Sequence, residues 1–191
     1  METKQTKRKI KRIAYHEAGH ALMALARGMP VKMVTIVPFR TNWVRSDASE
    51  PEVFTDHNTH LLGACFFEDG GTVTSVLNSV DVSVAGARAE VAISRIIGKP
   101  LTEREAVYIM RGDHRNIRDA VCSVDPDMYY DEKNFDTVML QSRRRCDKIL
   151  FHYWNVVELI AEALIIKKVL TGDEVLKIKN KAVSEMIDNG N

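Results

Sequence analysis

The chain has 191 residues, of which 45% are hydrophobic, so it is long enough to bury one core and suits a single domain. Its 27 basic and 26 acidic residues leave a net charge of +1, which gives no electrostatic reason to expect nucleic acid or an anionic membrane as a partner. Apolar runs are too short to predict a membrane span, since Lys167 and Lys168 interrupt the best candidate.

The three cysteines, Cys65, Cys122 and Cys146, are widely spaced and follow no metal-binding pattern, which is typical of free thiols in a reducing compartment. The basic start of the chain is not followed by an apolar segment of signal-peptide type. We therefore expect a cytoplasmic protein in which residues 1–8 form a flexible, solvated extension.

The first predicted element is a helix over residues 9–27, whose apolar stripe ends before Gly28 and Pro30. A strand is predicted over residues 31–37, where β-branched residues are frequent. Residues 40–60 are polar and of mixed charge, without clear periodicity. This segment is predicted to be a long loop inserted into the domain.

A short strand is predicted over residues 62–67, followed by a helix over residues 72–97. Thr102 and Glu105 have the spacing of a capping box, and Asp113 is a candidate start for the next helix.

The C-terminal part of the chain is predicted to be helical over residues 134–168, with a break near Asn155 as an option, and over residues 173–188. The expected fold class is α+β and mostly helical. It has one domain over residues 1–191, with a small β-sheet and a C-terminal helical region over residues 134–191.

Five residues near the start, His16-Glu17-Ala18-Gly19-His20, match the H-E-x-x-H pattern of zinc peptidases. Two histidines four apart on a helix point from one face, so both imidazoles can bind the same Zn²⁺. Glu17 then lies beside the metal, where hydrolysis needs a general base. Gly19 costs about 1 kcal/mol of helix stability relative to alanine, which indicates a close approach there. The alternative is a helix with two ordinary histidines and a solvated glutamate.

A catalytic zinc usually has three protein ligands and a fourth position open to water. The third ligand must come from elsewhere in the chain, and the residues alone leave the choice open. The candidates are Glu90, Asp113, His114, Asn116 and Asp119, with His57 and His60 in the predicted loop as more distant ones.

Residues 14–22 resemble the protease domain of the FtsH-type ATP-dependent zinc metalloproteases, in which H-E-A-G-H is the usual form. Weaker similarity follows in the same order at residues 34–38, 62–67, 86–90, 161–164 and 170–175. The resemblance implies an HExxH zinc-peptidase-like fold. It also implies an enzyme that hydrolyses peptide bonds of unfolded polypeptides. It implies Zn²⁺ as the cofactor, His16 and His20 as metal ligands, and Glu17 as the general base.

In this family the third ligand is an aspartate in a T-G-A-x-N-D-L-like segment that opens a helix. The matching stretch is residues 111–117, and aligning on Gly112 puts Asn116 at that position. Sliding the alignment by three residues puts Asp113 there and keeps the apolar helix face in phase. We favour Asp113 because a carboxylate suits zinc better than an amide, with Asn116 as the alternative. The purely structural interpretation is that Asp113 caps the helix.

The resemblance also implies that substrate binds as an extended strand along Gly63, Ala64, Cys65 and Phe66. Glu90 and Arg88 are expected to support the fold or to orient a ligand rather than to act on substrate.

Family members carry membrane spans and an ATPase module before the protease domain, and neither is found here. We therefore expect a stand-alone peptidase domain, natural or truncated. The competing hypothesis is a catalytically inactive FtsH-like binding or regulatory module, which Asn116 at the glycine-aligned position favours. A homo-oligomer and a separate ATPase partner both stay open as expectations.

Overall fold

The computed structural model describes residues 4–37, 39–43, 53–61, 63–67, 73–102, 105, 109, 111–124 and 131–188. The chain is α+β and mostly helical, as the sequence predicts. In chain order the elements are α1 (Lys4–Ala26), β1 (Val31–Thr35), β2 (Phe39–Trp43), β3 (Val53–Leu61), β4 (Ala64–Phe67), α2 (Val73–Ile96), α4 (Arg111–Val124), α5 (Glu132–His152), α6 (Trp154–Lys167), β5 (Val169–Thr171) and α7 (Gly172–Asp188).

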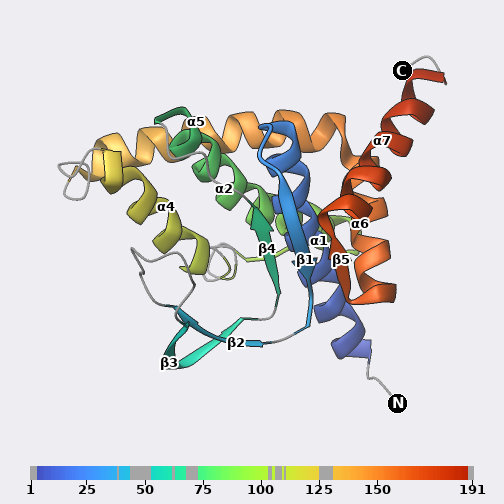
Figure 1. Ribbon diagram of the computed structural model, residues 1–191, viewed down its shortest axis with the longest axis horizontal. Coiled ribbons are helices and arrows are strands. Elements are labelled where there is room, and N and C mark those ends of the chain that lie inside the picture. Colours follow the sequence, from blue (N-terminus) through green and yellow to red (C-terminus); the bar gives the residue numbers. More distant parts are fainter. Residues whose placement is uncertain are drawn as a thin grey trace.

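Helix α1 lies at the centre of the molecule. Figure 1 shows it behind the sheet, with α2 and α4 on one side and α6 and α7 on the other. The Tyr15 ring packs against the Trp154 ring of α6, with centroids 5.7 Å apart. Other apolar residues of α1 are fully buried, namely Ala14, Ala18, Ala21, Leu22, Met23 and Ala24. The helix is therefore buried on several sides, and this explains why polar residues on it can also be buried.

Gly19 allows α1 and α2 to approach closely, as the sequence predicts. A β-carbon at this position would lie 2.7 Å from the carbonyl oxygen of Ala85 and 2.7 Å from the β-carbon of Ala89. Both distances are shorter than van der Waals contact, so any side chain would push α2 away. The loss of helix stability caused by glycine is thus offset by closer packing of α1 against α2.

The three-stranded sheet has the order β4-β1-β5, and both strand pairs are antiparallel. Val34 in the central strand lies opposite Cys65 of β4 and Leu170 of β5. Val34 and Leu170 are fully buried, so this row of the sheet faces the core. The predicted strand near residues 62–67 is confirmed as β4.

Strand β5 was not predicted, and its three residues lie between the predicted helices over residues 134–168 and 173–188. The helical region breaks at Tyr153, two residues before the predicted Asn155. Helix α6 ends at Lys167, and the next residue, Lys168, has a φ of 70° and turns the chain into β5. Three residues are too few to show an alternating apolar pattern, so only the pairing with β1 reveals this strand.

The prediction of a long loop over residues 40–60 is wrong in part. Strands β2 and β3 form an antiparallel pair there, with Phe39 opposite Leu61 and Trp43 opposite Val53. Figure 1 shows this pair extending from the ends of β1 and β4. Backbone hydrogen bonds hold such a pair whether or not its side chains alternate, so a polar sequence concealed it. Residues 44–52 lie outside the described residues.

The prediction of a flexible extension over residues 1–8 is also wrong in part, because α1 begins at Lys4. The segment before residue 9 contains no glycine or proline, and its lysine, glutamine and arginine residues favour a helix. The basic stretch therefore continues the first helix, and residues 1–3 lie outside the described part of the chain.

The predicted capping box at Thr102 forms. The Thr102 N–H donates to Glu105 Oε2 at 2.9 Å, and the Glu105 N–H donates to Thr102 Oγ1 at 3.3 Å. The same reciprocal pair, which was not predicted, joins Thr171 and Glu174 at the start of α7 at 2.9 and 3.3 Å. Each pair satisfies two backbone donors, and the second pair helps to fix where α7 starts.

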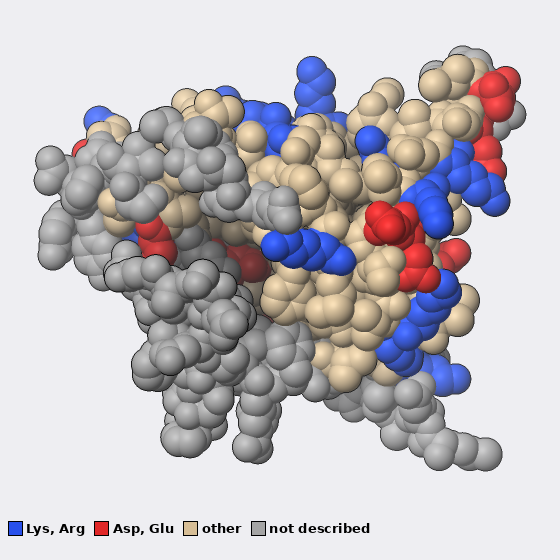
Figure 2. Space-filling view, viewed as in Figure 1, with Lys and Arg blue, Asp and Glu red and all other residues tan. Residues whose placement is uncertain are grey.

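All three cysteines are free, as predicted. Within the described residues no single helix is long and apolar enough to cross a bilayer, although α5 and α6 meet the length and composition test as a pair bent by 81°. Figure 2 shows basic and acidic side chains interspersed over the described part of one face, in keeping with the balanced composition.

Two isoleucines on α6 test whether its inner face carries the core. Ile160 is fully buried, whereas Ile166 is 80% exposed. We expect Ile160→Ala to lower the free energy of unfolding by about 2–5 kcal/mol, since it leaves a cavity, and Ile166→Ala to change it by less than about 0.5 kcal/mol. Urea denaturation of both variants measures the difference, and equal losses would contradict the packing described.

Candidate metal centre

Helix α1 carries the three residues of the H-E-x-x-H motif on its buried side. Glu17 is 6% exposed and His20 is 7% exposed, and His16 is partly buried. The two imidazole rings meet edge to face, with centroids 4.6 Å apart. The spacing of four residues thus places both rings at one point of the helix surface, as predicted.

Asp113 of α4 reaches the same point. Its Oδ2 lies 3.3 Å from His16 Nε2, and its Oδ1 lies 3.6 Å from His20 Nε2. One ligand atom from each of the three residues lies within 4.8 Å of the others. Among the described residues, these three form the group of histidine, cysteine, aspartate and glutamate side chains that could hold a metal ion.

The other ring nitrogens are held by α2. His20 Nδ1 lies 2.7 Å from the Val82 carbonyl oxygen, and His16 Nδ1 lies 3.0 Å from Glu90 Oε2. A carbonyl oxygen only accepts hydrogen bonds, so His20 Nδ1 must carry the proton there. An ionised carboxylate imposes the same choice on His16. In the neutral histidines both Nε2 lone pairs therefore point toward Asp113, as metal binding requires.

Two glycines leave space for this arrangement. A β-carbon at Gly86 of α2 would overlap the His20 ring, and one at Gly63, just before β4, would lie 2.8 Å from Glu17 Oε1. The start of β4 therefore lies directly against the Glu17 carboxylate. A larger residue at either position would displace a motif side chain.

The electrostatics of the metal-free site suit a cation. Burial lowers the pKa of His16, but hydrogen bonds to Asp113 and Glu90 outweigh burial and raise that pKa well above its usual range. Burial also raises the pKa of Asp113, but His20 and His16 outweigh this and keep the pKa below its usual range. Burial, with the charge of His16, lowers the pKa of His20. A proton on His16 thus supplies the positive charge that balances Asp113.

Glu17 has an environment of its own. Burial, and to a lesser degree the charges of Asp113 and Glu90, raise its pKa from 4.5 to about 8, although His16 opposes the shift. A carboxylate with this pKa takes up a proton readily near neutral pH. A cation bound nearby would favour the ionised form and lower the pKa again.

The donor set fits zinc. Two imidazole nitrogens and one carboxylate are the ligands found in catalytic zinc sites, and they leave one position open. Zinc–ligand bonds of about 2.0–2.2 Å in a tetrahedron separate neighbouring ligand atoms by about 3.4 Å. Asp113 Oδ2 lies 3.3 Å from His16 Nε2 and Asp113 Oδ1 lies 3.6 Å from His20 Nε2, so each histidine faces a different oxygen at a distance close to this value.

The other predicted site residues lie in different places. Glu90 orients His16, as expected, and Arg88 pairs with the exposed Asp147 at 2.6 Å, outside the group. Asp119 is exposed on α4. The side chains of Asn116, His114, His57 and His60 lie outside the described residues.

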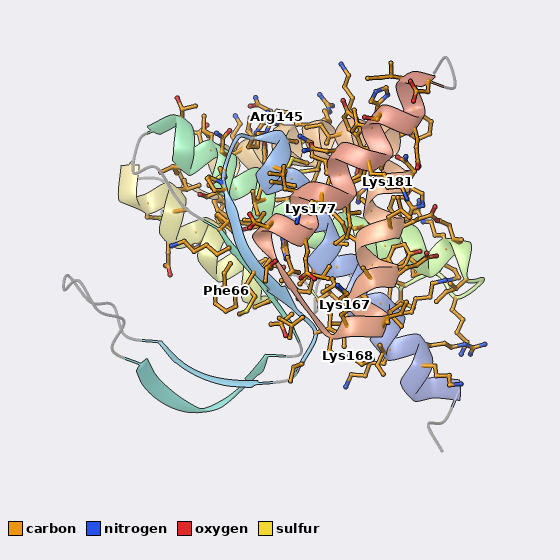
Figure 3. All side chains as sticks on the ribbon, turned by 45° about the vertical axis from the view of Figure 1, so that its right-hand side comes forward. Phe66, Arg145, Lys167, Lys168, Lys177 and Lys181 are labelled. Atoms are coloured by element: carbon orange, nitrogen blue, oxygen red, sulfur yellow. The ribbon has the colours of Figure 1, made fainter. Side chains whose placement is uncertain are left out.

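Of the predicted substrate-binding residues, Gly63 directly precedes β4, and Ala64, Cys65 and Phe66 are the first three residues of that strand. Burial, and then the charge of Glu17, raise the pKa of Cys65 well above its usual range, so this thiol is neutral and close to the motif. Figure 3 shows Phe66 at the β4 side of the sheet, away from Lys177 and Lys181 of α7.

Sequence reasoning missed three groups that shape the site: the Val82 carbonyl, Gly86 and Arg12. Every residue has a backbone carbonyl, so the sequence cannot single out that of Val82. The role of Gly86, which leaves space for the His20 ring, becomes visible only when the two helices are seen packed together. Arg12 donates to Glu90 at 2.8 Å, but in the sequence it was only one of several basic residues near the start of the chain. Its position one turn before His16 was the signal available.

Comparison with protein-family models and with curated proteins finds no match for this chain.

Glu17→Gln tests the burial of this carboxyl group. In the unfolded metal-free chain Glu17 loses its proton near pH 4.5, and in the folded chain near pH 8. The folded state binds more protons in this interval, so Glu17 lowers stability as the pH rises. We expect the free energy of unfolding of Glu17→Gln to be higher than that of the wild type by at least about 1 kcal/mol at pH 8. At pH 5 the difference should be smaller.

Urea denaturation in the presence of a chelator measures this difference. Glu162→Gln on α6 is the matched control because Glu162 is an exposed helical glutamate, and it should keep the wild-type pH dependence. The same dependence in Glu17→Gln and the wild type would contradict a buried Glu17 with a raised pKa.

Proposed function

We propose that this protein is a zinc-dependent metallopeptidase of the FtsH type, which hydrolyses peptide bonds of unfolded polypeptides. The observation that carries the proposal is the meeting of His16 and His20 of one helix with Asp113 of another, beside a buried glutamate. A solvated helix face with two ordinary histidines would need none of these contacts.

Three residues would hold the metal: His16 and His20 through Nε2, and Asp113 through its carboxylate. When bound, zinc supplies Lewis acidity, which lowers the pKa of the attacking water to about 7 and polarises the scissile carbonyl. Glu90 and the Val82 carbonyl keep the two rings in the tautomer that this requires.

Glu17 is the general base of the proposal. It accepts the proton of the attacking water and later delivers it to the leaving amine. Burial keeps competing bulk water away from its carboxylate, and a bound cation would favour the ionised form that accepts the proton.

The substrate would lie along β4 as an added strand. Within the described residues β4 is paired with β1, and addition of a strand to a sheet is a common way for a protein to bind an extended peptide. Because Gly63 lies against Glu17, a strand added there would pass the general base. This supports Gly63, Ala64, Cys65 and Phe66 as the substrate-binding segment.

Asp113 is preferred to Asn116 as the third ligand. Its two oxygens already face both histidines, and its charge is the one the site stabilises. Capping of α4 alone would not bring this side chain to α1.

Cleavage of unfolded casein tests the proposal. The zinc-loaded wild type should cleave it, and Glu17→Gln should retain about one zinc per chain but lose about 10²–10⁴-fold in rate, because the base is removed and the ligands are kept. Glu162→Gln should keep full activity. Cleavage is followed by release of fluorescent peptides, and zinc by elemental analysis.

A wild type that binds zinc but cleaves no polypeptide would contradict the peptidase and favour the inactive binding or regulatory module. Unchanged activity of Glu17→Gln would assign the base elsewhere.

A further inference from the structure

We propose that Arg12 is a positioning residue of the metal centre, which acts on His16 through Glu90. The inference rests on the proposed function, since it concerns zinc binding by the same three ligands. It adds a residue outside the H-E-x-x-H motif and outside the ligand set.

The contacts form a chain of three side chains across two helices. Arg12 Nε donates to Glu90 Oε1 at 2.8 Å, and a terminal Arg12 nitrogen lies 2.8 Å from the same oxygen. The second oxygen, Glu90 Oε2, lies 3.0 Å from His16 Nδ1. One carboxylate of α2 thus gives one oxygen to each of two residues of α1.

Helical periodicity makes this pairing specific. Arg12 and His16 are four residues apart, so their side chains lie one above the other on α1 and face the same segment of α2. The Arg12 side chain is 30% exposed and that of Glu90 is 9% exposed. The guanidinium therefore closes the solvent side of a carboxylate that is otherwise enclosed by protein.

The function of Arg12 follows from what Glu90 must do. A carboxylate that orients a metal-binding histidine must be fixed in its rotation and must keep its charge. When a metal binds His16 the ring is neutral, and Arg12 remains the positive partner of Glu90. A planar guanidinium fixes both the charge and the direction of Oε1, which a flexible ammonium group does less well.

Without Arg12, Glu90 Oε1 would lose the donor described here, and the carboxylate would be free to turn. His16 Nδ1 would then lose its fixed acceptor, and Nε2 its fixed direction toward Asp113. Such changes around a ligating histidine typically weaken metal binding by about 10–100-fold.

Competition for zinc with a chromophoric chelator tests the inference on the purified full chain. Arg12→Ala should bind zinc about 10–100-fold more weakly than the wild type, and Arg12→Lys should recover part of the loss. Arg144→Ala on α5 is the matched control because Arg144 is exposed, and it should leave zinc affinity unchanged. Circular dichroism of each metal-free variant should match the wild type.

A double-mutant cycle separates positioning through Glu90 from a general effect of charge. In a Glu90→Gln background, Arg12→Ala should cause little further loss of zinc affinity, since the residue it acts through has already changed. A wild-type affinity in Arg12→Ala would overturn the inference alone, and so would an equal loss in both backgrounds. A wild type that binds no zinc would overturn the proposed function and this inference together.

Discussion

The contact of α1 with α2 at Gly19 sets the positions of the groups that could hold a metal. Because Gly19 has no side chain, the backbone of α2 at Ala85 comes against α1 between the two histidines. The Val82 carbonyl and the Glu90 carboxylate then reach His20 and His16, which fixes both rings. A larger residue at this position would separate the helices and break both hydrogen bonds. The geometry of the site therefore depends directly on the close packing of α1 against α2.

That packing also encloses an excess of negative charge. Glu17, Glu90 and Asp113 lie within one region of the interior, and buried carboxylates are costly unless cations balance them. Arg12 balances Glu90, and a proton on His16 balances Asp113 in the metal-free protein. For Glu17, burial and the charges of Asp113 and Glu90 disfavour the ionised carboxylate and so raise its pKa. A divalent cation between the two histidines and Asp113 would replace that proton and would stabilise the remaining carboxylates.

The sequence predicted the elements whose patterns are long or chemically distinctive. Neighbouring residues encode the first helix, the capping box at Thr102 and the pair of motif histidines. The α+β class follows from the sum of such local helix and strand patterns. Asp113 was one of several candidates, and it was selected through the resemblance, the helix phase and the chemistry of the ligand; the structure brings its side chain to both histidines. What was missed depends on tertiary contacts. Strand β5 is defined by its pairing with β1, the β2–β3 pair by backbone hydrogen bonds in a polar segment, and the His20 tautomer by a carbonyl on another helix.

The central claim is that His16, His20 and Asp113 together bind zinc. X-ray diffraction from crystals of the zinc-loaded protein, recorded above and below the zinc absorption edge, tests it most directly. The claim predicts an anomalous peak bonded to Nε2 of both histidines and to an Asp113 oxygen, at about 2.0–2.2 Å from each. A peak whose third protein ligand is Asn116, or no peak between these residues at saturating zinc, would contradict it.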